Sequence, residues 1–444
     1  MCRGRAAIRM FDKTAPPKIP VRGMSGRQPS LLRDPEFLKF WTGQSVSMLG
    51  SQFTLLALPI AAAVTLRASP AEMGVLAALR FAPSLLFGMV AGVWLDRAPR
   101  RPVMVVTQLA SATVLATVPV AAVMHVLSIQ QLYVVAFLVG SAAAFFGVAQ
   151  VSFMPTLVGR DRLVEANARY QTSRTMASLI GPGLAGAAVQ LLTAPVAIVI
   201  DASSFLVGAA TAFWLRASEP QAHRVRRRHV VREASAGFAL LRHQPLLRGI
   251  TGTLLIANTG GGMSAAVFVL LFVGQIGIPP AQLGLVFVAS SLSSLLGSLL
   301  TQPLQRRAGL GPAMVLATLL LAAGVLVRAG AAFAHRPLIL PLLVAGALIS
   351  GLGLMTYNVA QQAIQQAVIP DRLLGRTTAG VGLIVNAGSV AASVAGGLLG
   401  QLIGLRWALV TAAAITVCCA LPTALSPLRI LRDLPDAESV QAAG

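Results

Sequence analysis

The 444-residue sequence predicts an all-α membrane protein with twelve transmembrane helices in two pseudo-symmetric six-helix halves. Three observations lead to this prediction: 56% of the residues are hydrophobic, only 11% are charged, and long apolar runs recur along the chain. A water-soluble protein of this size needs a charged exterior. A helix in lipid, by contrast, crosses the hydrocarbon core with about 20 apolar residues. The mean hydropathy of +0.76 agrees with residence in a membrane.

The apolar runs between charged and turn residues give the expected helices. The first six are expected at approximately 38–65, 71–95, 102–124, 129–152, 168–190 and 195–215. The second six are expected at approximately 249–273, 281–304, 311–333, 337–361, 377–400 and 406–425. The chain thus divides into a tail over 1–33, an N-terminal half over 34–215, a basic linker over 216–248, a C-terminal half over 249–425 and a tail over 426–444.

The arginines indicate the orientation, because cytoplasmic loops carry the excess of basic residues. If the N-terminus is inside, the outer loops hold only Arg67, Arg336 and Arg406. The inner segments then hold the linker arginines and Arg97, Arg100, Arg101, Arg160, Arg162, Arg169, Arg306, Arg307, Arg372, Arg376, Arg429 and Arg432. A shift by one helix would scatter the arginines over both faces. We therefore expect both termini and the linker in the cytoplasm.

Several other function classes lack a signature in the sequence. The net charge of +21 lies in short gaps between apolar runs, which argues against a nucleic-acid-binding face. The three cysteines have neither disulfide nor metal-ligand spacing, and the five histidines lie in loops or at helix ends. No glycine-rich phosphate loop is present. We therefore expect no enzyme activity, no metal and no cofactor. The basic, Pro/Gly-rich first 33 residues predict a disordered cytoplasmic tail, and Met24 is an alternative start.

An internal repeat supports the division into two halves. The stretch VGRDRL at 158–163 matches VIPDRL at 368–373, a spacing of 210 residues. At the same spacing MGVLAALRFAPSLL (73–86) corresponds to LGLVFVASSLSSLL (283–296), and Gly186 corresponds to Gly396. We therefore expect the same order of helices in each half.

The segment GVWLDRAPRR at 92–101 resembles the signature loop of the major facilitator superfamily. The matching positions are Gly92, Asp96, Arg97, Arg100 and Arg101, whereas Pro99 stands where that pattern usually has glycine. Other phrases resemble the drug-exporter branch of that superfamily, with its macrolide and enterobactin exporters: DPEFLKFWTGQSVSMLG (34–50), SRTMASLIGPGLAG (173–186), APVAIVIDASSFL (194–206) and IPDRLLGR (369–376). The resemblance covers about 33–425 and implies the fold of that superfamily and a transport function.

The signature loop also implies a conformational gate. Asp96 lies at a predicted helix C-terminus, where the helix dipole disfavours a carboxylate, so it needs a partner. Solvated Arg97 is one candidate. The resemblance implies another, the N-terminus of the helix expected at 377–400, near Thr377 and Thr378, which would hold the cytoplasmic side shut. Arg100 and Arg101 either pair with Asp161 or only follow the basic pattern of inner loops.

A second motif lies at Gly181-Pro182-Gly183-Leu184-Ala185-Gly186. Proline removes a helix hydrogen bond and glycines allow close helix approach, so Gly181, Pro182 and Gly186 are predicted to pack helices. The motif resembles the antiporter motif of exporters in the superfamily, which implies export. Ala185 and Ala177 stand where that motif usually has glycine.

Four charged residues fall within the predicted spans: Arg80, Arg174, Asp201 and Arg328. Such residues are costly in a membrane and mark functional sites. Arg328 and Arg174 lie near helix ends. Arg80 and Asp201 are expected at a similar depth, roughly 10–14 Å below the outer surface of the membrane. Three alternatives stay open for Arg80 and Asp201: a mutual ion pair, separate partners, or a role with protons or substrate. Asp201 is the main candidate for a membrane-embedded proton site.

The polar residues expected to face a central cavity are few: Gln44, Ser47, Gln52, Gln150, Asn258, Tyr357, Asn358 and Gln361. A mainly apolar cavity suits a large, lipophilic, weakly charged solute better than a sugar or phosphate. We therefore predict a monomeric secondary exporter of a lipophilic drug or metabolite. Its partners would be that substrate, the lipid bilayer and coupling protons. The alternatives are a lipid flippase or importer of the same fold, or a membrane sensor.

The orientation is tested by reporter fusions after Arg248 and Gly444. We expect both fusions to be active with a cytoplasmic reporter and inactive with a periplasmic one, because the arginine excess surrounds both positions. Fusions that are active only in the periplasm would reverse the predicted orientation.

Overall fold

The computed structural model describes residues 30–95, 98–216 and 240–433, and all regular elements of these segments are helical. The N-terminal half contains α1 (Pro35–Ile60) with its π-helical continuation η2 (Ala61–Thr65), α2 (Pro70–Leu95), α3 (Arg100–Val123), α4 (Ile129–Val158), α5 (Leu163–Leu192) and α6 (Ala194–Phe213). The C-terminal half contains α8 (Pro245–Val269) with η4 (Leu270–Gln275), α9 (Pro280–Ala308), α10 (Leu310–Gly330), α11 (Arg336–Val368), α12 (Asp371–Ile403), α13 (Leu405–Val417) and α14 (Ala420–Leu425).

The prediction of twelve transmembrane helices is confirmed, because twelve helical segments of the described chain have the length and hydropathy of membrane spans. The largest differences are at helix ends. The predicted span 337–361 continues to Val368, and the predicted span starting at 168 begins at Leu163. The apolar run marks only the hydrocarbon layer, whereas the helix continues through polar residues until a residue such as Pro370 stops it.

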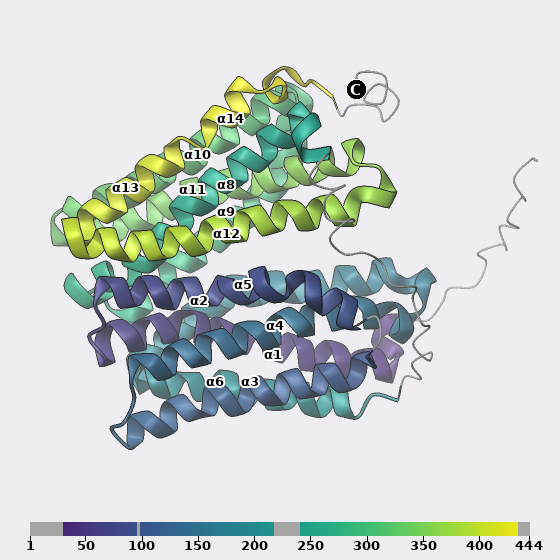
Figure 1. Cartoon of the computed structure of the whole chain (residues 1–444), viewed down its shortest axis with the longest axis vertical. Coiled ribbons are helices and arrows are strands. Elements are labelled where there is room, and N and C mark those ends of the chain that lie inside the picture. Colours follow the sequence, from purple (N-terminus) through teal and green to yellow (C-terminus); the bar gives the residue numbers. More distant parts are fainter. Residues whose placement is uncertain (1–29, 96–97, 217–239, 434–444) are drawn as a thin grey trace, which may run out of the picture.

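The two halves repeat one packing scheme, which confirms the expected pseudo-symmetry. In the N-terminal half α1 packs on α5 and α6, and α4 packs on α2 and α3. In the C-terminal half α8 packs on α12 and α13, and α11 packs on α9 and α10. The π-helical segments η2 and η4 extend the C-terminal ends of the equivalent helices α1 and α8, and they contact each other. Figure 1 shows the halves one above the other.

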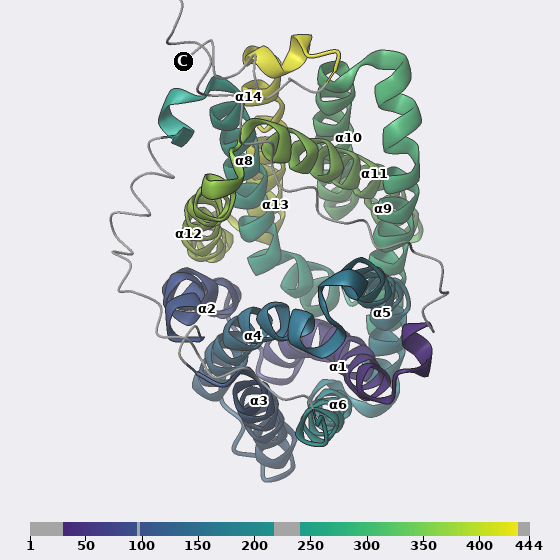
Figure 2. The same ribbon diagram turned by 90° about the vertical axis from the view of Figure 1, so that its right-hand side faces the viewer.

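The halves meet mainly through two helix pairs, α2 with α12 and α5 with α9 (Figure 2). Glycines permit both crossings. A Cβ atom at Gly74 would lie 2.9 Å from Cα of Gly397, and a Cβ atom at Gly284 would lie 3.3 Å from Cα of Gly186. Since Gly74 and Gly284 are 210 residues apart, the internal repeat places equivalent glycines at the two crossings. Small residues let helix backbones approach closely in this way.

The two ends of the bundle differ. We call the end at which α6 ends and α8 begins the linker side, and the opposite end the loop side. On the loop side one hydrophobic cluster joins the halves and includes Ile60, Met73, Ile198, Leu271 and Leu283. On the linker side each half has a cluster of its own.

Glycines near the linker side agree with this difference. A Cβ atom at Gly88 or Gly92 of α2, or at Gly382 of α12, would meet no atom within 4 Å. The halves therefore pack tightly on the loop side and are separate on the linker side.

Gly186→Ala tests the crossing of α5 and α9. The new Cβ would lie 2.6 Å from the Pro280 carbonyl oxygen, so the substitution should weaken the loop-side contact by about 1–3 kcal/mol. We expect faster labelling, by an impermeant maleimide added on the loop side, of a cysteine placed at Met73 in a chain with Cys2, Cys418 and Cys419 replaced by serine. Gly88→Ala is the matched control. Equal labelling of both variants would show that the crossing does not restrain opening.

Candidate functional site

Two adjoining cavities lie among the helices of the N-terminal half. The larger has a volume of about 400 Å³ and is bordered by α1, α2, α4 and α6, with Ala265 of α8 from the other half. The smaller has a volume of about 250 Å³ and is bordered by α1, α3, α4, α5 and α6. Ser51, Ala143 and Phe205 border both cavities. Their combined volume is within the range of sites for small organic molecules.

A polar stripe on α1 connects the cavities. Gln44, Ser47, Ser51 and Thr54 recur at the three- and four-residue spacing that places side chains on one face of a helix. Gln44 and Ser47 border the smaller cavity, Thr54 borders the larger, and Ser51 borders both. The Ser47 hydroxyl donates a long hydrogen bond of 3.4 Å to Oε1 of Gln108 on α3. The stripe gives α1 a polar face that borders both cavities.

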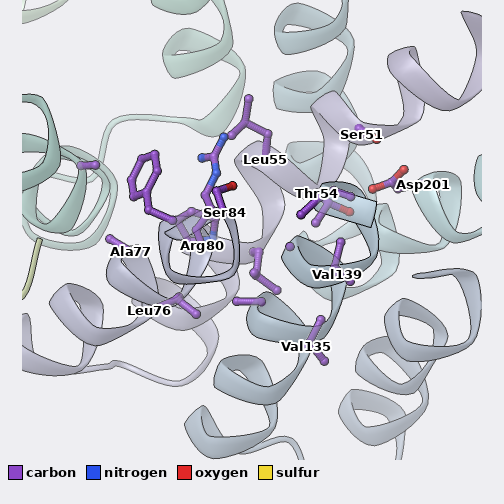
Figure 3. Close-up of a pocket in the computed structure, with 18 of the residues that line it drawn as sticks. Ser51, Thr54, Leu55, Leu76, Ala77, Arg80, Ser84, Val135, Val139 and Asp201 are labelled. Atoms are coloured by element: carbon purple, nitrogen blue, oxygen red, sulfur yellow. The ribbon is translucent and has the colours of Figure 1, made fainter. Parts of the chain in front are cut away.

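Asp201 borders the larger cavity from α6 and is only 1% exposed. Its Oδ1 atom accepts a hydrogen bond of 3.1 Å from the Ser204 hydroxyl. Gly50 allows α1 to cover this carboxylate, since a Cβ atom there would lie 2.0 Å from the Ser204 Oγ atom and 3.0 Å from Asp201 Oδ1. Figure 3 shows Ser51 and Thr54 of α1 beside Asp201. Hydroxyl groups and α1 thus enclose the carboxylate at the cavity wall.

Arg80 has different surroundings in the same cavity. It lies in the middle of α2, its side chain is exposed, and its guanidinium carbon lies 5.9 Å from the centre of the Phe81 ring. The salt bridges found among the described residues do not include an Arg80–Asp201 pair. In the view of Figure 3 these two side chains lie on opposite sides of Thr54. The described residues thus form no Arg80–Asp201 ion pair in this conformation, and the choice between separate partners and a role with protons or substrate stays a prediction.

The smaller cavity is bordered by Gln44, Gln52, Tyr170 and Arg174. The Tyr170 hydroxyl donates a hydrogen bond of 2.8 Å to Oε1 of Gln150, which fixes Gln150 behind the cavity wall. Four of the predicted polar residues, Gln44, Ser47, Gln52 and Gln150, are thus gathered on the α1 and α4 side of the N-terminal half.

The predicted polar residues of the C-terminal half border neither of these cavities. The Asn258 side-chain amide donates to the Leu254 carbonyl oxygen at 2.9 Å, within its own helix. Tyr357 is 4% exposed and lies within the linker-side hydrophobic cluster of the C-terminal half. Asn358 and Gln361 are half-buried on α11.

The structure locates part of the predicted gate. Asp96 and Arg97 lie outside the described residues, so the contact with α12 stays a prediction. Thr377 of α12 is fully buried, and its hydroxyl has no hydrogen-bond partner in the described part of the chain. Gly92 is half-buried near the end of α2.

The basic pair of the signature loop, Arg100 and Arg101, lies at the start of α3, and Arg101 links α3 to α6 by hydrogen bonds. Arg101 donates from Nε to the Ala212 carbonyl oxygen at 3.1 Å and from a second nitrogen to that of Phe213. A cation at these last carbonyls of α6 is favoured by the helix dipole. Asp161, the predicted partner of Arg100 or Arg101, is exposed, and its pairing stays a prediction.

The glycine-proline motif of α5 faces two neighbours. A Cβ atom at Gly181 would lie 2.4 Å from Cγ of Gln52 on α1, so Gly181 sets α5 against the helix that carries the polar stripe. The Pro182 carbonyl oxygen and Gly186 lie at the crossing with α9. One motif thus connects the wall of the smaller cavity with the contact between the halves.

The sequence interpretation missed Ser51, Thr54, Gln108 and Tyr170 as wall residues. A signal for the first two was present in their helical spacing from Gln44 and Ser47. Gln108 and Tyr170 carry no such signal, because their positions depend on how α3 and α5 rotate toward α1. Within the described residues no three His, Cys, Asp or Glu side chains form a group that could hold a metal.

Comparison with known proteins places this architecture in a family. The model of the Major Facilitator Superfamily matches residues 40–273 and again residues 250–443. The chain belongs to the Major Facilitator Superfamily. It is a transporter of that type and a multi-pass protein of the bacterial inner membrane.

The similar sequences include efflux proteins. The chain is 26% identical to the multidrug efflux pump Tap of Mycolicibacterium fortuitum, over 73% of this chain and 79% of that one. It is 24% identical to macrolide efflux protein A of Streptococcus pyogenes, over 50% and 54%. The uncharacterized MFS-type transporter YfiS of Bacillus subtilis (strain 168) is 24% identical over 86% and 90%. The predicted resemblance to drug exporters is confirmed.

The solved structures that resemble this chain share its fold. The nucleoside transporter NupG matches with a TM-score of 0.71 and 13% identity, over 88% of this chain and 98% of that one. A bacterial homologue of the iron transporter ferroportin, solved in an inward-facing state, matches with a TM-score of 0.72 and 16% identity, over 89% and 99%. At these identities the likeness shows the architecture alone.

Proposed function

We propose that this transporter exports a lipophilic organic solute by alternating access, driven by protons. The observation that carries the proposal is the pair of adjoining cavities in a protein whose halves pack on one side only. Large apolar side chains form much of the larger wall, among them Leu55, Leu76, Phe81, Val139 and Phe205. Such a wall favours an apolar body, since a sugar or inorganic phosphate would leave its polar groups without enough partners.

Alternating access is supported by the symmetry of the two glycine crossings. Because α2–α12 and α5–α9 are equivalent contacts, the halves can rock about them without unfolding either half. With the predicted orientation the separated linker side faces the cytoplasm, so the structure corresponds to a cytoplasm-facing state. In the opposite state Asp96 would approach the N-terminal part of α12 near Thr377.

Export is supported by the efflux proteins among the similar sequences. A lipophilic solute that enters the inner membrane can reach a cytoplasm-facing cavity, and a proton gradient can drive its removal. Membrane-embedded acids are the usual proton carriers of such transporters. Asp201 is the acid that borders the larger cavity.

Transport is tested in inside-out membrane vesicles with the neutral dye N-phenyl-1-naphthylamine, the anionic dye 8-anilino-1-naphthalenesulfonate and a panel of macrolides. We expect the vesicles to accumulate at least one of these compounds when a proton gradient is applied, and to release it when the gradient is collapsed. Vesicles without the protein are the control. A sensor would move no compound, and a flippase would move labelled phospholipid without moving the panel, so either result would contradict the proposal.

Asp201→Asn tests the proton site. Asparagine keeps the size of the side chain and an oxygen that can accept the Ser204 hydrogen bond, but it cannot carry the proton. We expect proton-driven accumulation to fall to the level measured without a gradient, while insertion and dye binding remain. Asp433→Asn, at an exposed acid outside both cavities, is the matched control. Normal coupling in Asp201→Asn would assign the proton to another group.

A further inference from the structure

The charge that the cavities offer to a bound molecule is positive. The larger cavity contains two ionisable side chains, Arg80 and Asp201, and the smaller contains Arg174. Asp201 is 1% exposed and hydrogen-bonded to Ser204, whereas both arginines are exposed. A solute in the cavities therefore meets guanidinium groups and does not meet an open carboxylate.

Arg80 is placed where a cation is costly without a partner. It is ten residues from Pro70 and fifteen from Leu95, about 15 Å and 22 Å along α2, so neither end of the helix is near. Its only charge-related contact within the described chain is the Phe81 ring. A guanidinium with no acid beside it, in an apolar cavity, calls for an anion from outside the protein.

Arg174 repeats this situation in the smaller cavity. The neighbouring basic residues of the same region have acidic partners, Arg162 with Asp34 at 4.0 Å and Arg169 with Glu165 at 3.8 Å. No such salt bridge to Arg174 occurs among the described residues. Arg174 is eleven residues from Leu163, about 16 Å from the linker-side end of α5. A solute that enters from the linker side therefore reaches Arg174 before Arg80.

We propose that the transported solute is an amphipathic organic anion, whose single acidic group, a carboxylate or sulfonate, pairs with Arg80. The inference rests on the proposed transport function and specifies its substrate class. The apolar body of the solute lies along Leu55, Leu76 and Val139, which border the larger cavity with Arg80. The acidic group pairs first with Arg174. It then moves past Ser51 and Phe205, which border both cavities, and pairs with Arg80. One guanidinium neutralises one negative charge, so a polyphosphate would keep unpaired charges, and a sugar unpaired hydroxyl groups, against the apolar wall of this cavity.

The test uses two dyes that differ only by one sulfonate, 8-anilino-1-naphthalenesulfonate and N-phenyl-1-naphthylamine. Their dissociation constants are measured by fluorescence titration with the purified full-length protein. We expect the parent to bind the sulfonate more tightly than the neutral dye. Arg80→Gln should weaken sulfonate binding by about 10- to 100-fold, as expected for a lost charge-assisted hydrogen bond, and leave the neutral dye nearly unchanged.

The control is Arg406→Gln. Arg406 also lies over an aromatic ring, at 5.8 Å from the centre of Phe333, but borders neither cavity. Arg406→Gln should therefore leave both dissociation constants unchanged. Arg80→Lys should keep part of the sulfonate affinity that Arg80→Gln loses. Equal loss of both dyes in Arg80→Gln would make Arg80 a packing residue and overturn the proposal. Tighter binding of the cation tetraphenylphosphonium than of the sulfonate would also overturn it.

Vesicle transport separates this inference from the proposed function. Accumulation of the neutral dye without the sulfonate would overturn the anion inference and leave export in place. Arg80-dependent sulfonate binding without transport of any compound would support the anion site and contradict export.

Discussion

The close approach of helix backbones at two glycine crossings is the constraint on which the rest of the structure depends. Gly74 meets Gly397, and Gly284 meets Gly186, with no room for a Cβ atom at either place. Because both crossings lie on the loop side, the hydrophobic cluster there seals the two halves together. The separation of the halves on the linker side follows from this one-sided contact.

The charged residues within the helices depend on the same packing. Gly50 and Gly181 draw α6 and α5 onto the two flanks of α1, and this places the polar stripe of α1 between Asp201 and Arg174. The Ser204 hydroxyl donates to the carboxylate, and Ser51 and Thr54 of the stripe lie beside it, so Asp201 has polar surroundings inside the membrane without a cation beside it. Arg80 has no comparable set of polar neighbours among the described residues. The protein therefore encloses Asp201, whereas the Arg80 side chain is open to the cavity.

The helices were predictable from the sequence, but the wall of the cavities was predictable only in part. A transmembrane span and a 210-residue repeat depend on composition along the chain, which the sequence contains directly. Whether Gln44 or Asn258 borders a cavity depends on how each helix is rotated about its axis. Gln44 and Gln52 border the smaller cavity because α1 turns a polar face toward it. Asn258 binds its own helix, and Tyr357 lies in a hydrophobic cluster, since packing in the C-terminal half leaves these residues away from the two cavities.

The repeat also shows where the function departs from the symmetry of the scaffold. The positions 210 residues after Arg80, Arg174 and Asp201 are Ser290, Ile384 and Thr411, none of which is charged. The position 210 residues after Gln44 is Leu254, and the one after Ser51 is Gly261. Among the glycines at the crossings, Gly74 corresponds to Gly284, and Gly186 corresponds to Gly396 beside Gly397, whereas the three ionisable residues have no charged counterpart. In the proposed mechanism, motion between the halves uses both copies of the repeat, whereas substrate binding and proton coupling belong to the N-terminal copy and the C-terminal half closes over it.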